Sequence, residues 1–188
     1  CSPNENADNK AWSDRGGYVS GFESLWNPEG FAVAASTLNQ LDPLFQWALH
    51  CARTALADAG DARQGAVDRG RVGAIFGNLG YPSTTMTKYA EAIWQGQPAP
   101  NPLNRFMSGG AANILEQALG LAPGVTCLDT ACASSLYAIK LACDRLHDGS
   151  VDMMLAGAVN GADDLFVHVG FTALNAMSPT GRSRPFHS

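Results

Sequence analysis

Long apolar runs, clusters of basic residues and a secretory leader are all missing from this sequence. Its apolar stretches fall short of the ~18 residues that a membrane-spanning helix needs, so we expect no membrane span. Lys and Arg form no cluster within a net charge of −5, which argues against nucleic acid as a partner. Residues 1–10 are polar and acidic, unlike the apolar core of a signal peptide. These absences favour a globular protein that acts in the cytoplasm.

The cysteines lack the spacing of a disulfide scaffold or a metal site. Five cysteines are an odd number, which fits a reducing compartment better than a disulfide framework. Cys127 and Cys132 are separated by a spacing that metal ligands do not use, and no histidine pairs with a cysteine at ligand spacing. We therefore expect no metal site among these residues.

The sequence has enough apolar residues for one domain with a substantial core. Of its 188 residues, 46% are hydrophobic and only 15% are charged. Predicted strands alternate with predicted helices, which indicates a layered α/β fold with a mostly parallel sheet. The strands are expected at 71–76, 125–130 and 152–160, and the helices at 43–59, 84–94, 104–119, 136–147 and 162–174.

The helix expected at 43–59 has the clearest ends. Asp42 is a preferred N-cap residue, Pro43 suits the first helical position, and Gly60 suits the left-handed conformation that ends a helix. Small and apolar residues at helical spacing predict one buried stripe. The stripe consists of Leu44, Ala48, Ala52, Ala55 and Ala59.

Cys132 is the candidate catalytic residue, because it lies where the chain changes from strand to helix. Residues 125–130 predict a short buried strand, and the very small residues 131–135 then lead into the helix at 136–147. A sharp strand-to-helix turn lifts one side chain onto a crest, and Cys132 is the one nucleophile there. The backbone N–H groups and the dipole of a helix start favour the negative thiolate. Covalent acyl transfer needs this arrangement.

A small buried residue in an apolar context is the alternative interpretation of Cys132. The helix after it carries no charge before Lys140, so we expect its start to be buried and its end to reach solvent. Core packing is favoured over chemistry for the three cysteines within apolar helix or strand patterns. These are Cys51, Cys127 and Cys143.

Residues 129–135, DTACASS, resemble the active-site signature of β-ketoacyl synthases, the condensing enzymes of fatty-acid and polyketide assembly. The resemblance continues in the family's order and spacing through residues 138–143, 152–160 and 177–186. Ala133 stands where the commoner family form has Ser, which is a conservative difference.

The resemblance implies that residues 1–188 are the N-terminal half of a thiolase-like, layered α/β domain. The intact parent would be an elongating ketosynthase of a modular polyketide or polyunsaturated-fatty-acid synthase. Cys132 would take an acyl group from the phosphopantetheine thioester of an acyl carrier protein. A malonyl-carrier thioester would then lose CO₂ and attack that acyl group to give a 3-ketoacyl product. The resemblance implies a homodimer with neighbouring synthase domains as partners. It implies no metal or redox cofactor.

The remaining histidines and arginines give weaker signals. His168 lies in an apolar segment and is expected to be a satisfied core histidine. His50 and His147 are expected to be solvated or boundary residues on helices. Arg182 and Arg184 are expected to be solvated or ion-paired, with contact to phosphopantetheine as the alternative.

The resemblance also implies that part of the catalytic machinery lies outside this sequence. The family's two catalytic histidines and a Lys belong to the second half of its fold, and none of the four histidines here has their sequence context. We therefore expect a chain truncated at both ends that does not condense by itself. Two alternatives stay open. A chain-length-factor-like subunit should lack the nucleophile that Cys132 provides, whereas a non-elongating scaffold domain would bind acyl chains without condensing them.

Overall fold

The computed structural model describes residues 10–61, 68–105, 107–161 and 164–186. The chain divides into two compact units, Trp26–Gly161 and a smaller one built from the described parts of Cys1–Leu25 and Ala162–Ser188. The larger unit holds the main core and Cys132. No helix within the described residues is long and apolar enough to span a bilayer.

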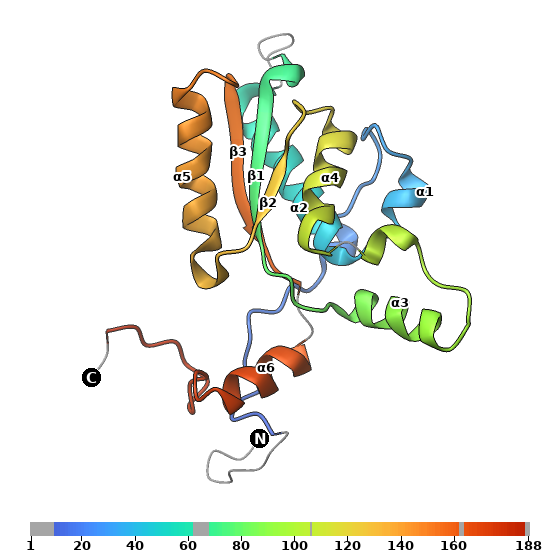
Figure 1. Ribbon diagram of the computed structural model, residues 1–188, viewed down its shortest axis with the longest axis vertical. Coiled ribbons are helices and arrows are strands. Elements are labelled where there is room, and N and C mark those ends of the chain that lie inside the picture. Colours follow the sequence, from blue (N-terminus) through green and yellow to red (C-terminus); the bar gives the residue numbers. More distant parts are fainter. Residues whose placement is uncertain (1–9, 62–67, 106, 162–163, 187–188) are drawn as a thin grey trace. The chain divides into compact units, whose positions relative to one another are not determined.

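A parallel sheet of three strands forms the centre of the larger unit (Figure 1). The strands are β1 (Val72–Asn78), β2 (Thr126–Leu128) and β3 (Met153–Val159), in the order β2-β1-β3. Ile75 of β1 is paired with Thr126 of β2 on one side and with Ala156 of β3 on the other. Parallel neighbours need crossover connections, and helices lie in both crossovers here. The predicted parallel α/β arrangement is therefore confirmed.

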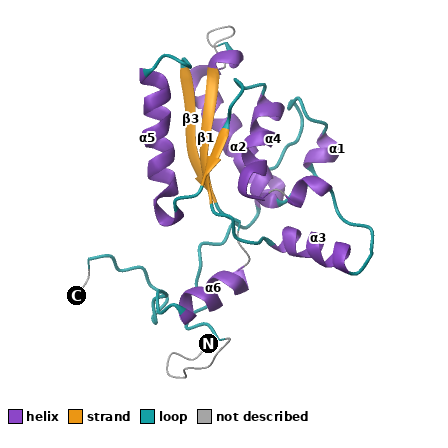
Figure 2. Ribbon diagram, viewed as in Figure 1, coloured by secondary structure: helices purple, strands orange, loops and turns teal. Residues whose placement is uncertain are grey.

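Helices cover the two faces of this sheet in separate layers (Figure 2). Helix α5 (Ser134–His147) packs on one face, and α2 (Pro43–Leu56) and α4 (Met107–Leu119) pack on the other. Because side chains alternate along a strand, Val72, Ala74 and Phe76 of β1 join the core with α2 and α4. Gly77 faces α5 and lets that helix approach the strand closely.

The main core lies between the sheet and the layer of α2 and α4. Its largest fully buried side chains include Phe45, Leu49, Leu56 and Leu115. The predicted cap of α2 is confirmed, since the carboxylate of Asp42 accepts a 2.9 Å hydrogen bond from the Leu44 N–H, and Pro43 follows it.

The predicted stripe of α2 is only half right. Leu44, Ala48 and Ala52 are buried, but Ala55 and Ala59 are exposed. The longer side chains of Leu49 and Leu56 fill the core instead. The α-helix ends at Leu56, and the wider turn Ala57–Asp61 follows, with Gly60 at a φ of 91°. Ala59 therefore lies outside the regular helix, whereas Ala55 lies within α2 on a side that the core does not cover.

The connection from β1 to β2 contains α3 (Thr84–Trp94) and the 3₁₀ turn η4 (Pro102–Arg105) before α4 begins. The helix expected at 104–119 is thus split, because the buried Asn104 side chain serves a different purpose. Its Oδ1 accepts from the Asp42 N–H at 2.8 Å, and its Nδ2 donates to the Gln40 carbonyl at 2.9 Å. These bonds fix η4 against the start of α2 and stop one continuous helix.

Two strands are more exposed than predicted. β2 spans only three residues, of which Thr126 is exposed. β3 has no fully buried residue, and Ala156 and Ala158 in its second half are exposed. Both are edge strands of a narrow sheet, so the described part of the chain covers each on one side only.

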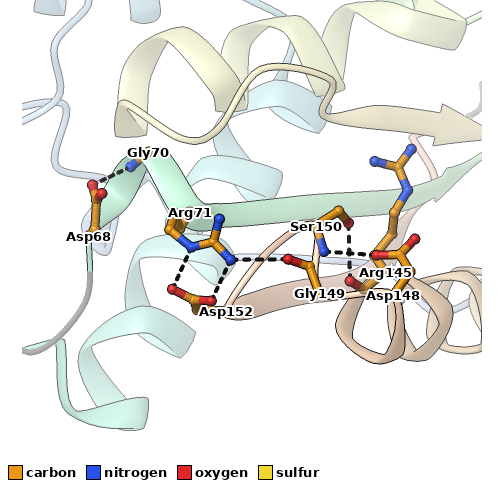
Figure 3. A network of polar contacts seen from close by, with 8 residues as sticks. All are labelled: Asp68, Gly70, Arg71, Arg145, Asp148, Gly149, Ser150 and Asp152. Carbon is orange, nitrogen blue, oxygen red and sulfur yellow. Dashed lines mark hydrogen bonds and ion pairs between the residues drawn. The ribbon is translucent and has the colours of Figure 1, made fainter.

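Polar contacts hold the amino ends of β1 and β3 together (Figure 3). The Arg71 guanidinium donates to both oxygens of Asp152, at 2.6 and 2.7 Å, and to the Gly149 carbonyl at 3.1 Å. This bidentate bond lowers the pKa of Asp152 below its ordinary value, and hydrogen bonds from Ser150 lower that of Asp148. All three parallel strands begin at this end of the sheet. Cys132 follows β2, so it lies beyond the opposite end, where the strands finish.

The smaller unit contains the 3₁₀ turn η1 (Phe22–Ser24) and helix α6 (Asp164–Ala173). The N–H of Trp12 donates to the Thr172 hydroxyl at 3.3 Å and joins its two segments. His168 is half-buried, so its predicted place in the core is wrong. The ring does have a polar partner, as expected, since its Nε2 lies 3.2 Å from the Arg15 carbonyl oxygen. The apolar residues around it do not form a fully covered core, and the ring reaches a backbone carbonyl at the surface.

Candidate active site

Cys132 lies in a tight turn between β2 and α5. β2 ends at Leu128, the 3₁₀ turn η5 spans Ala131–Ala133, and α5 begins at Ser134. The predicted placement of Cys132 at a strand-to-helix turn is therefore confirmed. Its side chain is exposed, so the alternative of a small buried residue does not hold.

The expectation of a buried helix start is wrong for the described residues. Cys132 is exposed, and Leu136 in the first turn of α5 is 69% exposed. Only Ser134, Ala138 and Ala142 of α5 are buried, on the side of the helix that packs against β1 and β3. An uncharged helix start thus indicates apolar composition, but it does not say whether another segment covers the outer face.

The residue before Cys132 has an unusual backbone conformation. Ala131 has a φ of 51°, in the left-handed region that costs a residue with a Cβ roughly 1–2 kcal/mol. Side chains bind both of its peptide groups. The Asp129 carboxylate accepts from the Ala131 N–H at 2.9 Å, and the Ser134 hydroxyl donates to the Ala131 carbonyl at 2.7 Å. The Ser134 oxygen also accepts from the Thr130 N–H at 3.0 Å.

Two further contacts fix this turn to the carboxyl end of β1. The second oxygen of Asp129 accepts from the Gly80 N–H at 3.2 Å, in the loop after β1. Gly77 lies directly against Ser134, since a Cβ there would be 2.7 Å from the Ser134 Cβ and 2.9 Å from its carbonyl carbon. The start of α5 is therefore held against the sheet at a glycine.

The start of α5 suits a negative charge. Its N-cap position is occupied by Ala133 with no side-chain hydrogen bond, and its first turn has no acidic residue. Arg145 and His147 in the last turn complement the negative end of the helix. The dipole of α5 therefore favours a thiolate or an oxyanion near Cys132, while the N–H groups of Ala133 and Ser134 are already bonded to the Thr130 and Ala131 carbonyls.

The other cysteines divide into two kinds. Cys127 on β2 is half-buried, and burial raises the pKa of its thiol, partly opposed by a hydrogen bond from the Ala112 backbone. The prediction of core packing is wrong for Cys51 and Cys143, which are exposed on α2 and α5. Both lie on the sides of their helices that the sheet does not cover.

No described histidine belongs to the turn. His50 is half-buried on α2, across the sheet from α5, and His147 is exposed at the opposite end of α5 from Cys132. His187 lies outside the described residues. Arg182 and Arg184 are exposed, in keeping with solvated side chains. Within the described residues, no three His, Cys, Asp or Glu side chains gather in a way that could hold a metal ion.

Comparison with known proteins identifies the family. Residues 2–188 match the family described as β-ketoacyl synthase, N-terminal domain. The chain belongs to the β-ketoacyl synthase family. This ketosynthase chain is 32% identical to the PKS-NRPS hybrid synthetase acdB of Aspergillus candidus over 98% of its length, which is 7% of that relative. It is 30% identical to the mycoketide-CoA synthase of Mycobacterium tuberculosis over 98% of its length, or 4% of that protein.

Solved ketosynthase structures share the fold. The PfaC keto synthase–chain length factor matches with a TM-score of 0.86 and 33% identity, over 97% of this chain and 22% of that one. The oxazolomycin ketosynthase domain OzmH KS7 of Streptomyces albus matches with a TM-score of 0.76 and 26% identity. This match covers 94% of this chain and 30% of that one. The predicted thiolase-like ketosynthase fold is confirmed. The chain spans only a small fraction of the relatives and less than a third of these two structures.

Proposed function

We propose that this chain supplies the nucleophile of a decarboxylative condensation, with Cys132 as the catalytic residue. The Cys132 thiolate attacks the carbonyl carbon of an acyl-carrier thioester, and the phosphopantetheine thiol leaves. A malonyl-carrier thioester then loses CO₂, and its carbanion attacks the Cys132-bound acyl group. The new carbon–carbon bond forms as the thiolate of Cys132 leaves, which gives 3-ketoacyl-carrier protein and frees the enzyme.

The observation that carries this proposal is the exposed Cys132 in a held turn before an uncapped helix start. A nucleophile must reach its substrate, and the helix start stabilises negative charge at the sulfur and at the attacked carbonyl oxygen. The backbone N–H of Cys132 is one donor for that oxyanion, and the second donor belongs to the remainder of the domain. Family membership supports a condensing transferase at the general level.

The proposal includes an acyl carrier protein as substrate donor, a homodimer, neighbouring synthase domains and a cytoplasmic location. The relatives are synthases many times longer than this chain, which supports neighbouring domains in the parent. The two steps exchange thioesters and release CO₂, so their electrons balance without a redox cofactor.

The similar PfaC structure is that of a keto synthase and chain length factor. Cys132 favours the condensing subunit for this chain, because a chain-length-factor-like subunit should lack the nucleophile. A non-elongating scaffold would retain Cys132 and carry the acyl group without forming product. The condensing enzyme and the scaffold therefore differ in one measurable step, the formation of 3-ketoacyl product.

The test is product formation by the full-length protein that carries this chain. Purified protein is mixed with acyl- and malonyl-carrier proteins, and the 3-ketoacyl product is quantified by mass spectrometry. We expect Cys132→Ala to lower the rate by about 10³-fold or more. Cys143→Ala, which removes an exposed cysteine in the later part of α5, should stay near wild type. Acylation of wild type without product would identify a scaffold. Full activity of Cys132→Ala would refute the assignment of Cys132.

A further inference from the structure

Ala131 is held in the left-handed region by side chains on either side of it in the sequence. Its N–H is bound by Asp129 and its carbonyl by Ser134, at 2.9 and 2.7 Å. A residue with a Cβ keeps a φ of 51° only where the surroundings offset the strain, and such residues gather at functional sites. The residue that follows is Cys132, so the conformation of Ala131 sets the direction of its side chain and N–H.

We infer that Asp129 is a positioning residue for Cys132, acting through Ala131 and through the loop after β1. This inference rests on the proposed role of Cys132 as nucleophile. One carboxylate accepts from two segments, with Oδ1 bonded to the Ala131 N–H and Oδ2 to the Gly80 N–H at 3.2 Å. It therefore fixes the turn internally and also against the carboxyl end of β1.

The loop after β1, whose Gly80 N–H is bonded to Asp129, is itself anchored to the core. Ser83 is buried at the end of this loop, and its hydroxyl donates to the Asp42 carboxylate at 2.7 Å. Asp42 is buried at the start of α2, where it also caps that helix. Gly80 is thus a fixed partner, and the bond to Asp129 transfers that rigidity to the Cys132 turn.

Asp129 does not act as an ordinary helix cap. No side chain caps α5 at its N-cap Ala133, and the Ser134 hydroxyl already closes the turn between Thr130 and Ala131. The distinct contribution of Asp129 is to offset the strain at Ala131 and to set the turn relative to β1. Without the carboxylate, Ala131 relaxes toward a negative φ and Cys132 turns away from its attack position.

The experiment compares variants of the full-length protein by two measurements. These are the rate at which iodoacetamide labels Cys132, read by peptide mapping, and kcat and KM for condensation. We expect Asp129→Ala to lower the labelling rate and kcat by up to about 10²-fold, because small misplacements of a reacting group have this effect, while KM changes little. Asp129→Asn keeps an acceptor for Ala131 but loses the one for Gly80, so its rates should be intermediate.

Asp148→Ala is the matched control. Asp148 accepts from the N–H two residues on, that of Ser150, at 2.8 Å, as Asp129 does from Ala131, but it lies at the other end of α5. Its removal should leave labelling and kcat near wild type. If Asp129→Ala acted only through a general loss of stability, Asp148→Ala should lower the labelling rate and kcat as well. Thermal unfolding of each variant measures that loss of stability.

Rescue by glycine separates positioning from a purely structural role. Gly adopts a positive φ without a steric penalty, so Asp129→Ala with Ala131→Gly should regain part of the lost labelling rate and kcat. A structural defect would gain nothing from a more flexible backbone. Wild-type rates in both Asp129 variants, or a double variant no faster than Asp129→Ala, would overturn the inference. Failure of wild-type Cys132 to become labelled or acylated would instead refute the proposed function.

Discussion

Cys132 differs from the other exposed cysteines in the backbone around it. Cys51 and Cys143 reach solvent too, so exposure alone does not select a nucleophile. Cys132 precedes the first turn of α5, where N–H groups favour an anion, whereas Cys143 lies in the later part of the same helix beside Asp144. Cys127 is half-buried, and burial raises the pKa of its thiol.

A brief, substoichiometric pulse of iodoacetamide on the full-length protein should therefore label Cys132 first. Cys143 is the internal control, because it is equally classed as exposed but lies within α5, away from the helix start that Cys132 precedes. Peptide mapping gives the order of labelling. Faster labelling of Cys127 or Cys143 than of Cys132 would contradict the account of its reactivity.

The position of Cys132 could be predicted from the sequence, but the residues that hold it could not. Small residues after a β-branched stretch indicate a sharp turn, and this was sufficient to place the nucleophile. The roles of Asp129 and Ser134 depend on the φ of Ala131 and on the approach of Gly80, a contact between residues 49 positions apart. The preference of Asp for binding the N–H two residues on was the one local signal available.

At the scale of elements, the close packing of α5 on β1 depends on Gly77. A Cβ at this position would come closest to two atoms of Ser134, its Cβ and its backbone carbonyl carbon. Gly77→Ala should therefore push the start of α5 from the sheet and lower the free energy of unfolding by about 1–3 kcal/mol. Gly109→Ala is the control, because it lies in α4 with no atom within 4 Å of a built Cβ. Urea unfolding that shows equal effects for both variants would contradict this packing.

The ion pair at the amino ends of β1 and β3 gives a pH-dependent prediction. Arg71 lowers the folded-state pKa of Asp152, so the pair stabilises the fold above the unfolded pKa of about 3.9 and this contribution is lost as pH falls through the lower folded pKa. Asp152→Asn should therefore be less stable than wild type at pH 7, and the difference should shrink on acidification to pH near 3. Urea midpoints at both pH values measure it. A difference that grows in acid would show the opposite linkage.

Most elements followed from periodicity and capping residues, since Asp42, Gly120 and Gly149 all mark helix ends as their types suggest. The split between η4 and α4 did not, because the decisive bond joins Asn104 to the backbone of Asp42 across 62 positions. The burial of α5 was misjudged for a related reason. A helix pattern shows which residues are apolar, but only the neighbouring segments decide which of them are covered.

Over nearly its whole length, the chain matches solved ketosynthases in fold, and its relatives are far longer proteins. β2 lies at the edge of the described sheet, next to the Cys132 turn. We expect the full-length protein to be a homodimer, as the family resemblance implies. Sedimentation at micromolar concentration should give twice the monomer mass. A monomer that stays fully active would contradict this expectation.

If Cys132 is the nucleophile, it carries the acyl group before condensation, and mass spectrometry can locate that group. The full-length protein is incubated with a carrier protein that is loaded with an acyl group, without malonyl-carrier protein. It is then digested, and its peptides are fragmented to locate the added acyl mass. We expect the acyl group on Cys132, at an unchanged level in Cys143→Ala and absent in Cys132→Ser when assayed by thioester-specific release. An acyl group on Cys127 or Cys143, or a wild-type protein that is never acylated, would contradict it.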